Sequence, residues 1–130
     1  MSEIPENLLY ANTHEWVQFK THNHIRVGIS DFAQQQMGDL MYIELPKIGR
    51  QLIAGDQCAV VESVKTASDL FAPVTGVIIE INPAVIEAPE LVNDAPYQHW
   101  LFCIEVENPQ QLQTLVTADA YRNFISESSQ

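Results

Sequence analysis

The stretch "GDQCAVVESVKTASDLFAPVTG", from Gly55 to Gly76, has the pattern of two short strands joined by a tight turn and is the clearest indication of the fold. Gly55 with Asp56, and Pro73 with Gly76, are turn formers at its two ends. Lys65 lies between them in "SVKT", where small and β-branched neighbours leave its ammonium unsheltered. The sequence therefore predicts a hairpin that displays one of the three lysines of the chain at its tip.

Short segments rich in β-branched and aromatic residues continue on both sides of this hairpin, separated by Gly, Pro and Asn. Many short strands are stable as two packed sheets or a flattened barrel. We therefore expect an all-β fold, a flattened barrel or sandwich of two antiparallel sheets. The predicted strands are "EWVQF" (15–19), "HIRVGI" (24–29), "DLMYIELP" (39–46), "CAVVES" (58–63), "ASDLFAP" (67–73), "GVIIEI" (76–81) and "HWLFCIEVE" (99–107).

Three further segments carry helix or loop signals. "SDFAQQQMG" predicts one short helix with Ser30 as its N-cap and Gly38 as its C-terminal stop. The tail predicts two helices that pack on the sheets, one after the cap Asn108 with Leu112, Leu115 and Val116 on one face, and one capped by Thr117. Residues 82–98 contain three prolines and predict a loop with at most one helical turn. A length of 130 residues indicates one domain, with a core over about 10–107 and a helical tail over about 108–126.

The composition excludes several classes of function. Seventeen acidic against six basic residues give a net charge of −11, so neither nucleic acid nor an anionic membrane surface is an expected partner. Such a surface suits transient docking onto basic rims of other proteins. Cys58 and Cys103 lie in apolar runs without metal-ligand spacing and predict buried, reduced thiols. The first ten residues lack signal-peptide character, and no stretch has transmembrane length.

The segment "ESVKTASDL" resembles the modification hairpin of the lipoyl and biotinyl domains, and within these the glycine cleavage H-protein family. The resemblance extends in order through "YANTHEWV", "VGISDFAQQQMGDLMYIELPKIG", "APELVNDAPY" and "ADAYRNF", about nine-tenths of the chain. Biotinyl carriers have Met on both sides of the lysine, where Val64 and Thr66 stand here. The connection "PYQHW", from Pro96 to Trp100, is shorter than in the family and has no glycine.

The resemblance implies a barrel-sandwich hybrid fold and a carrier that is not itself an enzyme. Lys65 would hold lipoate as a covalent amide. The arm would take an aminomethyl group from glycine decarboxylase (P protein), yield it to an aminomethyltransferase (T protein), and be reoxidised by dihydrolipoyl dehydrogenase (L protein). These three proteins and a lipoate-attaching enzyme would be the partners, and the carrier is expected to be a monomer.

Three acidic residues are implied in this function by the same resemblance. Glu62 would be a recognition feature for the lipoate-attaching enzyme, or balance the charge of Lys65. Glu15 and Asp69 would line a cleft for the arm, since a carboxylate can hold a protonated amine. Alternatively, Glu15 caps a strand start and Asp69 is a solvated hairpin residue. His14, and His22 to His24, are expected to be solvated or structural rather than metal ligands.

Three other functions are alternatives to the carrier. A Schiff-base enzyme that uses Lys65 with Glu62 as base needs a desolvated pocket, which the polar hairpin tip does not offer. An H-like protein that relays lipoyl groups to other lipoyl domains would share the hairpin and fold. An unmodified β-sandwich adaptor would show a free Lys65 in its native host. The location expected is a bacterial cytoplasm, or the mitochondrial matrix for a processed chain.

Overall fold

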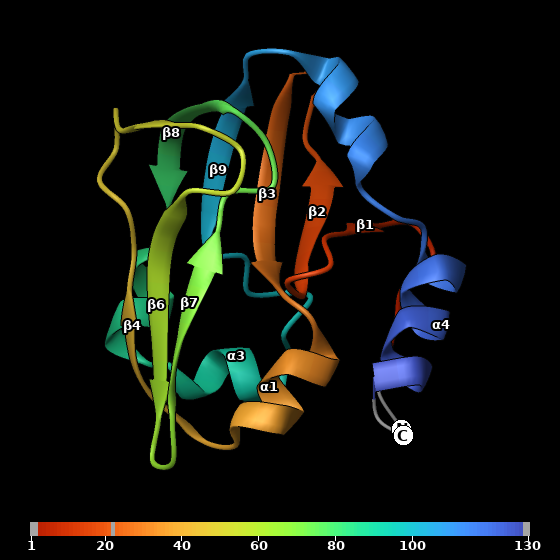
Figure 1. The fold of residues 1–130 in the computed structure, drawn as a ribbon. Helices are drawn as coiled ribbons and strands as arrows, with labels where there is room; N and C mark the ends of the chain where they lie inside the picture. The colour runs from red at the N-terminus through yellow and green to blue at the C-terminus, as the bar shows by residue number, and fades with distance from the viewer. Residues whose placement is uncertain (1–2, 22, 129–130) are drawn as a thin grey trace.

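The computed structural model describes residues 3–21 and 23–128, and its strands form two antiparallel sheets (Figure 1). The six-stranded sheet has the order β1–β2–β3–β9–β8–β5 and the three-stranded sheet the order β4–β6–β7. The strands are β1 (Leu9–Tyr10), β2 (Glu15–Phe19), β3 (His24–Ile29), β4 (Leu40–Glu44), β5 (Gln51–Leu52), β6 (Gln57–Ser63), β7 (Ala67–Phe71), β8 (Gly76–Ile81) and β9 (Phe102–Val106). The prediction of two antiparallel sheets is confirmed, and the sheets do not close into a barrel.

The main core lies between the two sheets. It combines buried residues of the six-stranded sheet, such as Ile25 and Ile104, with Val61 and Leu70 of the three-stranded sheet. Burying such side chains contributes about 1.5–3 kcal/mol each. Cys58 and Cys103 are buried free thiols, as predicted, and burial raises the pKa of Cys58 to about 12.

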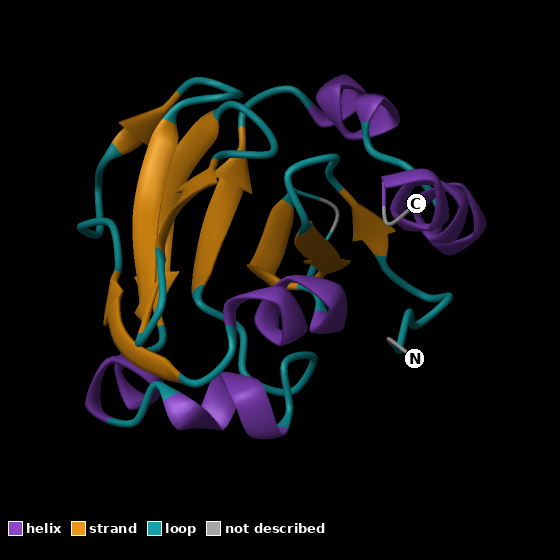
Figure 2. Cartoon of the chain, turned by 60° about the horizontal axis from the view of Figure 1, so that its bottom comes forward, coloured by secondary structure: helices purple, strands orange, loops and turns teal. Residues whose placement is uncertain are grey.

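Helices cover the end of the molecule to which the β6–β7 hairpin points (Figures 1 and 2). The helix α1 (Asp31–Met37) begins at Ser30, whose side chain accepts a hydrogen bond from the Ala33 amide, and ends at Gly38 with φ 82°. Both ends are as predicted, because Ser is a good N-cap and glycine tolerates a positive φ. The short helices α2 (Pro83–Glu87) and α3 (Glu90–Asp94) follow β8, and α3 contacts α1.

The prediction for residues 82–98 was wrong, because this segment contains both α2 and α3. Asn82 caps α2 through its side chain, and Pro83 occupies the first turn, where a missing N–H costs nothing. Pro89 stands at the N-cap of α3 for the same reason. Prolines therefore start these helices rather than break them.

The tail packs on the sheets as predicted, but its first helix differs from the prediction. Asn108 caps a 3₁₀ helix, η1 (Pro109–Thr114), which ends before Leu115. Val116 instead pairs with Tyr10 in a β-bridge, so it shares no helical face with Leu112. The helix α4 (Ala118–Ser128) then follows Thr117, whose hydroxyl accepts from the Ala120 amide.

A second buried cluster attaches α4 to the six-stranded sheet. Its buried residues are Leu8, Tyr10, Trp16, Ala118, Tyr121 and Ile125. The rings of Tyr10 and Tyr121 stack with centroids 4.6 Å apart. None of the helices in the described residues is long and apolar enough to cross a membrane.

Candidate functional site

The β6–β7 hairpin brings Lys65 to its tip, as the sequence predicts. The strands pair in register, with Val61 opposite Ser68 and Glu62 opposite Ala67. The turn is closed by a hydrogen bond from the Ser63 amide to the Thr66 carbonyl, 2.8 Å. The Ser63 hydroxyl also accepts from the amides of Lys65 and Thr66, at 3.3 and 3.2 Å. These bonds hold the turn in one conformation and fix the origin of the Lys65 side chain.

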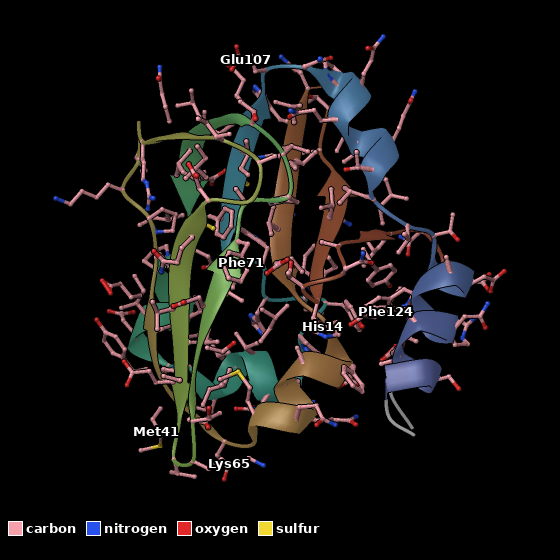
Figure 3. The ribbon with its side chains drawn as sticks, in the orientation of Figure 1. His14, Met41, Lys65, Phe71, Glu107 and Phe124 are labelled. Atoms are coloured by element: carbon pink, nitrogen blue, oxygen red, sulfur yellow. The ribbon has the colours of Figure 1, made fainter. Side chains whose placement is uncertain are left out.

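The Lys65 side chain is exposed and lies beside the end of α1 (Figure 3). A Cβ atom added to Gly38 would lie 3.5 Å from Lys65 Cε and 4.0 Å from Nζ, so the lysine stem passes close over this glycine. Among the described residues, Nζ has no hydrogen bond or ion pair, and Glu62 does not pair with it. The amine is therefore open to an enzyme that would acylate it.

A groove of about 290 Å³ lies between α1, the hairpin strands and the turn before β2. Its lining is Thr13, His14, Ile29, Phe32, Ala33, Gln36, Met37, Val61, Ser68 and Leu70. Six of these side chains are apolar, and the other four, Thr13, His14, Gln36 and Ser68, are polar. Because Met37 directly precedes Gly38, the groove begins beside the lysine stem. A larger cavity, of about 560 Å³, lies at the other end of β6, by Arg50 and Cys58, away from Lys65.

Glu15 is buried and bridges the two sheets. Its side chain is 0 % exposed, and its carboxylate accepts bonds from the Thr13 hydroxyl and, at 3.1 Å, from the Phe71 amide of β7. Burial raises the pKa of Glu15 to about 7, and the two hydrogen bonds only partly oppose that rise. Glu15 is not among the residues that line the groove.

Asp69 and Glu62 lie together on the outer face of the hairpin. Asp69 is opposite Val60 and Glu62 is opposite Ala67, so the two carboxylates are diagonal neighbours on one face. Both are exposed, whereas Val61 points to the core. Asp69 and Glu15 are therefore on different faces, and the structure does not bring them together.

His14 has a structural position that the sequence did not reveal. It has φ 77°, which is uncommon outside glycine, and its ring lines the groove. Its Nδ1 lies 2.7 Å from the Tyr121 hydroxyl, and that hydroxyl lies 2.7 Å from Ser30 Oγ. Burial lowers the pKa of His14. The separation of 107 residues between His14 and Tyr121 left no local signal of this contact.

No group of three or more metal-binding side chains occurs in the described part of the chain. His22, part of the tract considered for metal binding, lies outside the described residues. His24 Nε2 lies 3.2 Å from the Glu105 carboxylate, as part of an exposed pair. The "PYQHW" connection forms a turn, with the amides of Gln98 and His99 bonded to the Ala95 carbonyl.

Comparison with known proteins gives consistent matches. The profile of the family "Glycine cleavage H-protein" matches residues 8–128. The glycine cleavage system H protein of Methylococcus capsulatus is 46% identical over 127 residues, covering 98% of this chain and 100% of the relative. That of Alcanivorax borkumensis is 51% identical over 123 residues, covering 94% and 95%. The crystal structure of a glycine cleavage system H protein from Mycobacterium marinum superposes with a TM-score of 0.82 at 35% identity, covering 92% of this chain and 97% of that one.

Proposed function

This chain belongs to the glycine cleavage H-protein family, and on that premise we propose that it is a lipoyl carrier with the lipoyl group joined as an amide to Nζ of Lys65. The observation that carries the proposal is the exposed, unpaired ammonium at the tip of a hydrogen-bonded turn. The chain is not itself catalytic in this function. It serves glycine decarboxylase, the aminomethyltransferase and dihydrolipoyl dehydrogenase of a glycine cleavage system.

The residues around Lys65 fit such a group. The amine is exposed, and no described side chain pairs with it, so an attaching enzyme can reach it without breaking a contact within the protein. A lipoyl arm supplies a disulfide that can carry a group and be reduced and reoxidised. Apolar groove residues such as Phe32, Met37 and Leu70 can cover the aliphatic part of the arm, with Thr13 and Ser68 at polar positions.

The hairpin fixes the point from which the lipoyl arm extends. A flexible arm on a fixed turn sweeps a limited volume, so a docked partner meets its end at an effective concentration on the order of millimolar. The paired strands β6 and β7 and the bonds of Ser63 keep the origin of the arm fixed. A flexible backbone at this position would lower the effective concentration of the end of the arm.

Glu62, Asp69 and Glu15 would each have a different role in the carrier. We propose Glu62, three residues before Lys65 and exposed, as the recognition feature for the lipoate-attaching enzyme. We keep Asp69 as a candidate for holding a protonated amine, at the outer face of the hairpin rather than in the groove. Glu15 would support the arm site through its bond to the Phe71 amide, which holds the end of β7.

Mass spectrometry of protein purified from its own host tests the attachment site. We expect the peptide that contains Lys65 to carry the mass of a lipoyl amide, and Lys20 and Lys47 to be unmodified. Lys65→Arg keeps the charge but cannot be lipoylated, so it should remain folded and lose all carrier activity in a reconstituted glycine cleavage assay. A permanently free Lys65 in lipoate-replete cells, or an active Arg variant, would refute the proposal.

The cellular location is proposed from the kind of organism in which the relatives occur. The relatives named above are bacterial proteins. We propose a bacterial cytoplasm as the place of action, which accords with the two free, buried thiols. Fractionation of the native host, followed by immunoblotting for the chain, tests this location.

A further inference from the structure

A chain of hydrogen bonds runs from the start of α1 through α4 to the wall of the groove. The Ala33 amide donates to Ser30 Oγ at 3.2 Å. Ser30 Oγ lies 2.7 Å from the Tyr121 hydroxyl, which lies 2.7 Å from His14 Nδ1. Ser30 and Tyr121 are both 0 % exposed, so their hydroxyl groups are not open to bulk solvent.

The donor and the acceptor in each of these hydrogen bonds follow from the number of protons that the groups carry. The Ser30 oxygen already accepts from Ala33, and among the described residues its own proton has one acceptor, the Tyr121 oxygen. The single proton of Tyr121 is then available for His14 Nδ1. If Nδ1 carried a proton and donated it to Tyr121, one of the two buried hydroxyl protons would lack an acceptor, at a cost of about 1–3 kcal/mol.

We propose that Tyr121 is a positioning residue, which holds His14 as the neutral imidazole with its proton on Nε2. The side of the ring that is not bound to Tyr121 is then a hydrogen-bond donor. Within the described residues Nε2 has no hydrogen-bond partner, so it is free to meet a group that enters the groove. The tautomer assignment does not depend on the carrier function, whereas the role of His14 in the groove rests on the function proposed above.

The chemistry of the groove changes with this assignment. An N–H donor on its wall fits an oxygen or sulfur acceptor of a bound arm, and it cannot accept a proton from an ammonium group. A neutral ring also avoids repelling a positively charged amine. Burial, which lowers the pKa of His14, favours the same uncharged form.

The backbone of His14 supports a fixed ring. The positive φ of 77° is costly for a residue with a Cβ and persists where surrounding contacts impose it. The His14 amide donates to the Ala11 carbonyl at 2.9 Å, and its carbonyl accepts from the Ser30 amide at 2.9 Å. The ring also packs on Phe32 and Phe124, with centroids 5.1 and 5.9 Å away. Figure 3 shows His14 near α1, with Phe124 of α4 beside it.

Long-range ¹H–¹⁵N NMR of the unlipoylated full chain tests the assignment. In the wild type we expect the His14 ring to show a protonated Nε2 and an unprotonated Nδ1. Tyr121→Phe removes the hydroxyl while preserving the aromatic stacking, and should shift His14 toward a mixture of tautomers. Tyr10→Phe is the matched control, because it removes a hydroxyl from the ring stacked on Tyr121 and should leave His14 unchanged.

Two results would overturn the proposal: a wild-type His14 protonated on Nδ1, or an unchanged tautomer in Tyr121→Phe. The wild-type spectrum alone can refute the tautomer assignment, so the test remains valid even if Tyr121→Phe does not fold. The role in the groove is tested with lipoylated wild type. Loading the lipoyl arm with an aminomethyl group should shift the His14 Nε2 resonance, and an unaltered resonance would refute a contact between Nε2 and the arm. A chain that is never lipoylated at Lys65 would refute the carrier function and leave the tautomer result standing.

Discussion

At the scale of single residues, Glu15 is a carboxylate held between the two sheets. It belongs to β2, and its oxygen accepts from the amide of Phe71 in β7, the edge strand of the smaller sheet. Burial disfavours the charged form and raises the pKa of Glu15 from 4.5 to about 7. The folded state therefore binds this proton more tightly than the unfolded state. The resulting stabilisation is fully present below pH 4.5 and is lost as the pH rises through 7.

Glu15→Gln should remove this pH dependence while preserving an acceptor for the Phe71 amide. Between pH 5 and pH 8, the free energy of unfolding of the wild type should fall relative to that of the variant by roughly 2.5 kcal/mol, which is most of the free energy that corresponds to the pKa difference. Urea unfolding of both proteins at several pH values measures it. A constant difference between the two proteins across this range would show that Glu15 does not titrate as described.

At the scale of elements, the hairpin β6–β7 derives its defined tip from one side chain. Ser63 Oγ accepts from two turn amides, and the backbone bond between Ser63 and Thr66 closes the same turn. The β2–β3 hairpin has a comparable device, in which Thr21 Oγ1 accepts from the His24 amide at 3.2 Å. Exposed bonds of this kind contribute little to global stability, about 0.5–1.5 kcal/mol each, but they select the turn conformation.

Ser63→Ala should loosen the turn that carries Lys65. We expect faster hydrogen exchange at the amides of Lys65 and Thr66, slower lipoylation by a lipoate-attaching enzyme, and a loss of less than about 1.5 kcal/mol in unfolding free energy. Thr21→Ala is the matched control, since it frees the His24 amide in the other hairpin and should leave lipoylation unchanged. Equal lipoylation rates in Ser63→Ala and wild type would contradict a role for turn rigidity.

At the scale of the whole molecule, the acidic surface sets how the carrier meets its partners. The net charge of −11 becomes −12 when Lys65 loses its positive charge as an amide, since −11 − 1 = −12. Glu62 and Asp69 are exposed on the outer face of the hairpin, and the apolar Val64 next to Lys65 is 72 % exposed. A docking partner with basic residues around an apolar entrance would complement this surface.

Association with the partner enzymes should therefore weaken with salt. Raising the ionic strength from about 10 mM to about 150 mM shortens the Debye length from about 30 to about 8 Å. We expect the association rate with glycine decarboxylase to fall about tenfold over this range, because steering of opposite charges is screened. Stopped-flow measurements would show it, with unfolding free energies at both salt concentrations as the control. A rate independent of salt would exclude electrostatic steering.

Features that depend on neighbouring residues could be predicted from the amino-acid sequence. Turn formers around Gly55 and Gly76, with strand-like segments between them, predicted the hairpin and the display of Lys65, and Ser30 predicted the start of α1. These signals are local because backbone conformation and capping involve residues a few positions apart. The cap and prolines of α2 and α3 are equally local signals, but three prolines in one segment also favour a loop, and the sequence alone does not show that Pro83 and Pro89 stand at helix starts.

The groove, the burial of Glu15 and the hydrogen bond between Tyr121 and His14 could not be predicted in this way, because they form when distant segments pack together. The groove joins Thr13, Met37 and Ser68 from three separate segments, and Glu15 meets Phe71 across 56 residues. Whether a carboxylate near a strand start faces water or the core depends on which sheet packs over it. Contacts between residues distant in the chain arise from packing, and packing is a property of the folded molecule that no short stretch contains.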